Sequence, residues 1–234
     1  MVSHYELYGG GMMIAKEWEE RYLVGKSHSL WPWTDLIKYV KRYANLVEGD
    51  KVLELGPGIG ANIPYFLSIG VQYYAIEGSP TAVKLIRDKY PEIADKVVNA
   101  DFTKIIPFDE KFDLVIDRSS LTHNTTMSIL DSLAFIAEKL KPAGKFVGID
   151  WFAWEHGERV GRVTEDNAGD PFTFMFNAGK FSGCGAVHFS TKEHLSSIFA
   201  ESGFEIELLE YKESQIITPE KNKEATWNLV AMLV

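Results

Sequence analysis

The chain has 234 residues, of which 46% are hydrophobic and 24% are charged, so it is long enough to bury a full globular core. Its formal net charge of −9 argues against nucleic acid as a ligand, because phosphate contacts dominate nucleic-acid affinity and require a basic face. A small molecule is therefore the expected partner.

The location of the protein follows from what the chain lacks. No apolar run approaches the ~20 residues that span a bilayer, and the N-terminus lacks a basic segment followed by a long apolar core. A cytoplasmic protein without membrane contact is expected. Cys184 is the only cysteine, which rules out intrachain disulfides and Cys-rich metal sites. Because no His/Asp/Glu trio has ligand spacing, no metal is expected.

The first 48 residues form an aromatic segment that is expected to be helical. Thr34 or Asp35 is suited to cap a helix whose apolar positions fall roughly on one face, namely Leu36, Ile37, Val40 and Leu46. Trp31, Pro32 and Trp33 precede this helix. They form part of a pocket wall or dock the leading helix, and the sequence leaves both interpretations open.

Strands and helices alternate from Lys51 onward. The expected strands cover 51–55, 71–77, 96–101, 112–117, 144–152, 204–211 and 226–234, and the expected helices lie near 62–69, 80–90, 128–140 and 191–202. Continuous apolar strands such as LVI and FVGI indicate a parallel sheet that is covered on both faces. We therefore predict an α/β doubly wound fold, with the last two strands as a hairpin, in one domain over 1–234.

The stretch VLELGPGIG, at 52–60, places three glycines directly behind the first buried strand. Gly56, Gly58 and Gly60 allow a tight turn and remove side chains that would obstruct a ligand. In an open parallel sheet, ligands bind beyond the carboxyl ends of the strands, and the helix after this turn offers free amide groups. The loop therefore predicts a cofactor site.

Two cofactor classes fit the glycine loop. Gly56, Gly58 and Ala61 match the dinucleotide pattern, and Glu77 lies 21 residues beyond Gly56, close to the spacing of a ribose-binding acid. Either class requires a carboxylate at Glu77. Three features favour a cofactor other than NAD: Glu54 before the glycines, Asp101 after the third strand, and the absence of a separate catalytic domain.

The chain resembles class I S-adenosylmethionine-dependent methyltransferases over about residues 48–152. The resemblance rests on ordered motifs: V-L-E-L-G-P-G-I-G, Y-Y-A-I-E-G-S, N-A-D-F, F-D-L-V-I-D and L-K-P-A-G-K-F. The segments F-S-T-K-E-H-L and S-G-F-E-I-E extend it to the final helix and strand pair. It implies a Rossmann-like, mostly parallel seven-stranded sheet in order 3-2-1-4-5-7-6, with the seventh strand antiparallel.

The resemblance also implies roles for individual residues. The glycine loop packs against the methionine half of the cofactor, Glu77 binds the ribose, and Asp101 binds adenine with Phe102 nearby. Asp117 and Arg118 line the methyl end. The predicted cofactor set is Glu54, Gly56, Gly58, Gly60, Glu77, Gly78, Ser79, Asp101, Phe102, Asp117 and Arg118. Glu54 serves either as a direct contact or as a structural partner of the loop.

The segment DRSSLTH, at 117–123, supplies the catalytic candidates. Asp117 and His123 are the predicted catalytic residues. The pKa of a histidine lies near the working pH, so the His123 imidazole is suited to take a proton from a nucleophile. The alternative is a structural role for this segment, in which Ser119, Ser120 or Asn124 caps the next helix and Arg118 pairs with a surface acid. The glycine-rich insert 153–190 is expected to cover the acceptor or to form its own small core, and His156 and His188 are weaker candidates for a base.

The predicted function is methyl transfer from S-adenosylmethionine to an oxygen or nitrogen of a small molecule, with S-adenosylhomocysteine as the product. The alternatives are an NAD-dependent oxidoreductase and a non-catalytic protein that binds S-adenosylmethionine. The cofactor carries the activated methyl group, so the protein has mainly to supply position.

Overall fold

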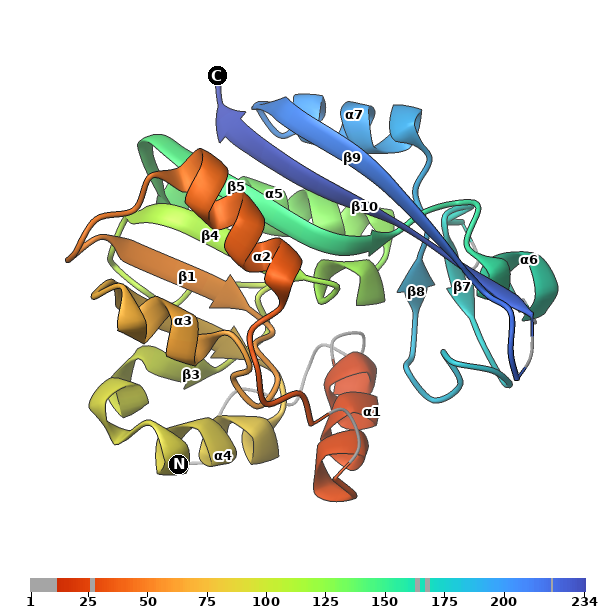
Figure 1. The fold of residues 1–234 in the computed structure, drawn as a ribbon, viewed down its shortest axis with the longest axis horizontal. Helices are drawn as coiled ribbons and strands as arrows, with labels where there is room; N and C mark the ends of the chain where they lie inside the picture. The colour runs from red at the N-terminus through yellow and green to blue at the C-terminus, as the bar shows by residue number, and fades with distance from the viewer. Residues whose placement is uncertain (1–11, 26–27, 163–164, 167–168, 220) are drawn as a thin grey trace.

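Figure 1 shows the computed structural model, which describes residues 12–25, 28–162, 165–166, 169–219 and 221–234. Residues 1–11 and 26–27 of the expected N-terminal segment, and 163–164 and 167–168 of the insert, lie outside the described residues. A seven-stranded sheet runs through the centre, with helices on both faces. Within the described residues, no helix is both long enough and apolar enough to cross a bilayer.

The central sheet has the strand order β3-β2-β1-β4-β5-β10-β9. Its strands are β1 (Lys51–Leu55), β2 (Gln72–Glu77), β3 (Val97–Asn99), β4 (Phe112–Arg118), β5 (Leu140–Phe152), β9 (Phe204–Ile216) and β10 (Asn222–Leu233). All pairs are parallel except those of β10, which runs antiparallel to β5 and β9. Counted within the sheet, this is the predicted order 3-2-1-4-5-7-6, which is confirmed.

Two hydrophobic clusters cover the two faces of the sheet. Leu53 and Leu55 point into the cluster formed with α5 (Thr126–Lys139) and α7 (Lys192–Glu201). Val52 points the other way, into the cluster formed with α2 (Thr34–Tyr39), α3 (Ile63–Ser68) and α4 (Pro80–Lys89). Successive side chains of a strand face opposite sides, so a strand that is apolar throughout needs both covers.

Local capping explains where the helices begin. Ser79 accepts a hydrogen bond from the Ala82 amide at 3.1 Å and starts α4, and Pro80 occupies its first turn. Thr125 likewise accepts from the Ser128 amide at the start of α5. The predicted helix that opens at Thr34 continues through a π-helical turn, η1 (Val40–Ala44), and ends before Leu46 because Asn45 takes a left-handed φ of 49°.

The last hairpin is longer than predicted. Strand β9 continues to Ile216 and β10 begins at Asn222, not at Thr226. The additional paired residues form an arm. At its end, the side-chain amide of Asn222 donates to the Glu158 carboxylate in α6 (Gly157–Arg162) at 3.0 Å. The insert holds a small antiparallel sheet, β6-β7-β8. Its strands are β6 (Glu165–Asp166), β7 (Thr173–Met175) and β8 (Val187–His188).

Candidate active site

The glycine loop follows β1 at the carboxyl edge of the sheet, where the chain connections run to opposite sides. Gly56 and Gly58 have positive φ values of 58° and 60°. A Cβ on Gly56 would lie 2.3 Å from the Ser120 Oγ, and a Cβ on Gly58 would lie 2.8 Å from the Tyr22 hydroxyl oxygen. Glycine is therefore required by backbone conformation and by close approach of other side chains. At Gly60 the close neighbour is the Ile63 side chain.

Glu77, at the end of β2, joins the glycine loop to the start of α4. One carboxylate oxygen accepts from the Gly58 amide at 3.0 Å, and the other accepts from the Ser79 amide at 2.8 Å. The side chain is only 6% exposed, and burial raises the pKa of Glu77 to about 7. Each oxygen has a further lone pair, so the carboxylate can accept from additional donors such as hydroxyls.

Glu54 turns away from the edge and supports the loop from beneath. Its buried carboxylate accepts from the Tyr73 hydroxyl at 2.5 Å and from the Asn62 amide at 2.8 Å. Burial raises the pKa of Glu54. The Asn62 oxygen in turn accepts from the Trp33 amide at 3.2 Å, so this network anchors the segment before α2. The geometry matches the structural alternative for Glu54.

The end of β3 brings Asp101 and Phe102 to the same edge. Asp101 Oδ1 accepts from the Thr103 amide at 2.9 Å and from its hydroxyl at 2.7 Å, while Oδ2 has no partner among the described residues. The Phe102 ring lies 3.8 Å from the position of a Cβ on Gly56. Glu77, Gly56, Asp101 and Phe102, which are distant in sequence, therefore lie around one edge of the sheet.

Gly78 and Ser79 serve the scaffold beside Glu77. The Asn99 side-chain amide donates to the Glu77 carbonyl at 2.8 Å and to the Gly78 carbonyl at 2.9 Å, which ties β3 to the end of β2. The Ser79 hydroxyl donates to the Glu19 carboxylate in α1 (Met12–Leu23). The predicted positions thus lie at the edge, with their backbone and hydroxyl groups already bonded.

Asp117, at the end of β4, is fully buried and holds the following turn. Its Oδ1 accepts from the Ser120 and Leu121 amides at 3.1 and 3.0 Å, and its Oδ2 accepts from the Trp151 indole at 2.7 Å. Burial raises the pKa of Asp117 to about 7. The carboxylate therefore shapes the loop that carries Arg118 and leads into the 3₁₀ helix η3 (Leu121–His123).

Arg118 joins the sheet edge to the leading segment. Its guanidinium carbon lies 3.4 Å from the centroid of the Trp33 ring, so the two groups stack. Its Nη2 lies 2.8 Å from Oδ2 of Asp150, which forms an ion pair. Trp33 therefore docks the segment before α2, one of the two roles that the sequence left open. Ser119 and Asp150 have left-handed φ values of 58° and 57°, and the Ser119 hydroxyl donates to the Asp150 carbonyl at 2.9 Å. Such backbone strain gathers at functional sites.

His123 lies beyond this turn, buried between aromatic rings. Its Nδ1 lies 3.1 Å from the Ala186 carbonyl, and because a carbonyl only accepts, Nδ1 carries the proton. The ring meets Trp18 edge-on at 4.9 Å and Phe152 at 5.8 Å. Burial lowers the pKa of His123 to about 4, so the imidazole is neutral at pH 7.

The insert histidines are also buried among rings. His156 contacts the rings of Phe152, Phe181 and Phe189, and its Nδ1 accepts from the Glu158 amide at 3.2 Å. His188 bonds to the His194 ring and to the Thr173 hydroxyl, both at 3.1 Å. Burial lowers the pKa of His156 to about 4 and that of His188 to about 3. The aromatic rings form the small core that was one of the two expectations for this insert.

Helix α1 contributes residues to the edge that the sequence did not single out. Trp18 contacts His123, Glu19 bonds to the start of α4, and Tyr22 lies against Gly58. The Trp18 and Tyr22 rings are 6.1 Å apart, as expected for positions i and i+4 on one helix face. That spacing is visible in the sequence, but it does not reveal what the face meets.

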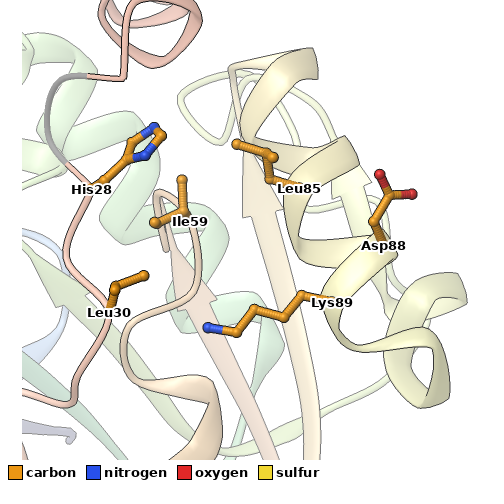
Figure 2. Close-up of a pocket in the computed structure, with 6 residues that line it drawn as sticks. All are labelled: His28, Leu30, Ile59, Leu85, Asp88 and Lys89. Carbon is orange, nitrogen blue, oxygen red and sulfur yellow. The ribbon is translucent and has the colours of Figure 1, made fainter.

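A hollow of about 360 Å³ lies on the outer side of the glycine loop (Figure 2). It is lined by His28, Leu30, Ile59, Leu85, Asp88 and Lys89, none of which belongs to the predicted cofactor set. The hollow therefore borders the predicted site without including it. In the part of the chain that the structure describes, no three acidic, histidine or cysteine side chains are grouped so that they could hold a metal.

Comparisons with known proteins show which family and which fold this chain has. The Methyltransf_23 family, described as a methyltransferase domain, matches residues 31–209. The chain is 38% identical over 66 residues to ribosomal RNA small subunit methyltransferase A of Chlorobaculum parvum, which covers 28% of this chain and 23% of that protein. The chain thus spans about a quarter of the length of the curated relatives that it matches.

Solved structures show the same fold at low identity. An S-adenosylmethionine-dependent methyltransferase of Methanosarcina mazei superposes with a TM-score of 0.67 at 18% identity, over 88% of this chain and 99% of that one. The glycopeptide N-methyltransferase MtfA, solved with S-adenosylmethionine, gives a TM-score of 0.58 at 18% identity, over 90% and 89% of the two chains.

The family match covers most of the chain and favours methyl transfer over the NAD-dependent alternative. The strand order that the motifs implied is also present. This chain therefore belongs to the methyltransferase domain family.

Proposed function

We propose that the protein transfers a methyl group from S-adenosylmethionine to an oxygen or nitrogen of a small molecule, and that the cofactor binds at the carboxyl edge between Glu77 and the glycine loop. The observation that carries the proposal is the buried Glu77 carboxylate, whose only bonds among the described residues are to backbone amides. A buried carboxylate gains from further donors, and the two ribose hydroxyls supply them.

The other residues of the edge fit the rest of the cofactor. Asp101 Oδ2, which has no partner among the described residues, suits the adenine amino group, and the Phe102 ring suits the adenine face. Arg118 lies on the side of the methyl group. Glu54 and Asp117 are assigned to positioning, because their oxygens already hold the scaffold and the turn.

The chain contributes mainly by holding the reactants in line. Once bound, the sulfonium cofactor supplies an activated methyl group. Correct placement of two reactants is worth about 7–11 kcal/mol, whereas a general base adds about 10²–10⁴-fold in rate. The strained ends of β4 and β5, fixed by Asp117, Ser119 and Asp150, provide a rigid edge for such placement.

A small-molecule acceptor is supported by charge and by the insert. The chain carries a formal net charge of −9, which disfavours a polyanionic acceptor. The aromatic rings of the insert adjoin His123 through Phe152, beside the methyl end of the proposed site. Because the chain is 38% identical over 66 residues to a ribosomal RNA methyltransferase, RNA is the alternative acceptor to test.

Cofactor affinity is expected to fall when the pH is lowered from 8 to 6. Burial raises the pKa of Glu77 to about 7, and only the ionised form accepts from both ribose hydroxyls. Protonation therefore competes with binding, and the dissociation constant of S-adenosylhomocysteine should rise by up to about tenfold over this range. Titration calorimetry at several pH values measures it, and an affinity that is constant from pH 6 to 8 would contradict the prediction.

His123→Phe is expected to lower kcat by about 10²-fold while leaving the affinity for S-adenosylhomocysteine unchanged, because we place the imidazole on the acceptor side. Burial lowers the pKa of His123 to about 4, so kcat should show no inflection near pH 6.5 from this group. Steady-state rates across pH 6 to 8 check both points. An unaltered kcat in the variant would remove His123 from the mechanism.

The function is tested in two stages. Calorimetric titration with S-adenosylhomocysteine and with NAD identifies the cofactor, and binding of NAD alone would refute the proposal. Isotopically labelled S-adenosylmethionine is then offered with a metabolite extract and, separately, with ribosomal RNA. Label in small molecules supports the proposal, label in RNA redirects it, and cofactor binding without transfer to either indicates a non-catalytic binder.

A further inference from the structure

Helix α1 lies between the aromatic cluster of the insert and the start of α4. In Figure 1 it stands between α4 and the strand β8 of the insert. Three residues of α1 make these contacts. Trp18 packs against the aromatic cluster of the insert and against His123, Glu19 bonds to the start of α4, and Tyr22 lies over the glycine loop.

Glu19 attaches this helix to the scaffold beside Glu77. Its carboxylate accepts from the Ser79 hydroxyl and from both the amide and the hydroxyl of Thr81, with the amide at 3.1 Å. Although burial alone raises the pKa of Glu19, these hydrogen bonds outweigh it and lower the pKa. A carboxylate at the start of α4 is also favoured by the helix dipole. These three donors come from the turn that follows Glu77.

Tyr22 reaches the part of the glycine loop nearest Glu77. The side chain is 8% exposed, and its hydroxyl oxygen lies 2.8 Å from the position that a Cβ on Gly58 would take. Burial raises the pKa of Tyr22, and the charge of Glu77 raises it further, so the hydroxyl stays protonated at neutral pH. The space that Gly58 leaves above the loop is therefore bordered by a hydroxyl group from α1.

We infer that α1 is a wall of the cofactor site, with Tyr22 as a cofactor-contacting residue and Glu19 as the positioning residue that holds it there. The inference rests on the proposed cofactor site. A molecule seated over Gly58 and bonded to Glu77 lies within reach of the Tyr22 hydroxyl, which donates or accepts one hydrogen bond. Glu19 fixes α1 to the start of α4. Its hydrogen bonds therefore control how often α1 moves away from the site and how fast the cofactor dissociates.

Two variants separate these roles. Tyr22→Phe removes only the hydroxyl and should weaken binding of S-adenosylhomocysteine by about 3- to 10-fold, the effect of one neutral hydrogen bond. Glu19→Gln keeps the size of the side chain but loses charge-assisted bonds, so S-adenosylhomocysteine should dissociate about tenfold faster. Calorimetry measures the first effect, and stopped-flow tryptophan fluorescence measures the second.

Matched controls exclude general damage. Glu20→Gln makes the same charge change at an exposed position of α1, and Tyr65→Phe removes a buried hydroxyl that has no partner among the described residues. Both should bind S-adenosylhomocysteine as the wild type does. Hydrogen exchange supplies an independent readout, because cofactor should slow exchange of the α1 amides in the wild type and less so in Glu19→Gln.

The outcomes distinguish this inference from the proposed function. If the wild-type protein fails to bind S-adenosylhomocysteine, both are overturned. If the wild type binds but Tyr22→Phe has equal or higher affinity, the contact is overturned while the cofactor site stands. Wild-type dissociation kinetics in Glu19→Gln, with no protection of the α1 amides, would likewise refute the wall.

Discussion

Replacing Glu77 by alanine is expected to weaken binding of S-adenosylhomocysteine by about 10²–10⁴-fold, because each charge-assisted hydrogen bond contributes about 1.5–3 kcal/mol and two ribose hydroxyls would be lost. The carboxylate also accepts from the Gly58 and Ser79 amides, so its removal loosens the loop that frames the cofactor. Titration calorimetry of the purified variant measures the loss.

Two comparisons make this result specific. Glu77→Gln retains one acceptor oxygen and should fall between the wild type and Glu77→Ala. Glu92→Ala removes an exposed carboxylate near α4 and should bind as the wild type does. Equal affinity in Glu77→Ala and the wild type would show that the cofactor does not reach this carboxylate, and the proposed site would have to move.

Asp117→Ala is expected to lower the free energy of unfolding by at least about 3 kcal/mol, since each of three donors left unpaired costs about 1–3 kcal/mol. Three donors lose their acceptor, namely the Ser120 amide, the Leu121 amide and the Trp151 indole. Urea unfolding followed by circular dichroism measures the change. A loss below about 1 kcal/mol would mean that the turn does not depend on this carboxylate.

The Trp151 contact is isolated by a double-mutant cycle. In Asp117→Asn, an NH₂ group replaces one of the two carboxylate oxygens, and an NH₂ group cannot accept from the Trp151 indole. Trp151→Phe removes the indole donor. The asparagine variant should therefore cost less in the Trp151→Phe background than in the wild type. Purely additive effects would show that the two side chains do not interact.

The same carboxylate gives stability a predictable pH dependence. Burial raises the pKa of Asp117 from 3.8 to about 7, so between these values the folded protein retains a proton that the unfolded chain has released. This contribution is fully present below pH 3.8 and is lost as the pH rises through about 7. Asp117→Asn should therefore show a shallower decline in stability over this window.

Several elements could be predicted because their signals are local. The runs LVI, at 114–116, and FVGI, at 146–149, have no polar side chain on either face, which is the pattern of a central parallel strand. Ser79 followed by proline marked the start of α4, and this boundary is confirmed. Strand ends were less accurate, since the β9–β10 arm is stabilised by Glu158 from a distant segment rather than by its own pattern.

The candidate site divides in the same way. The motifs predicted the glycine loop, Glu77 and Asp101 as cofactor positions, because a ligand that binds at strand ends requires glycines and acids there. They did not indicate that Asp117 would be occupied by the Trp151 indole, or that the His123 ring would be buried against Trp18. Both contacts join residues that are more than 30 positions apart.

The sequence by itself determined the order of strands and helices and the residues at the strand ends, because side-chain periodicity, capping and glycine conformation act within a few residues. The tertiary structure decided which of those residues are consumed by the scaffold and brought α1 over the loop. Burial and hydrogen-bond partners depend on segments that meet only after the sheet has assembled, and the contact of Tyr22 with Gly58 is one of them.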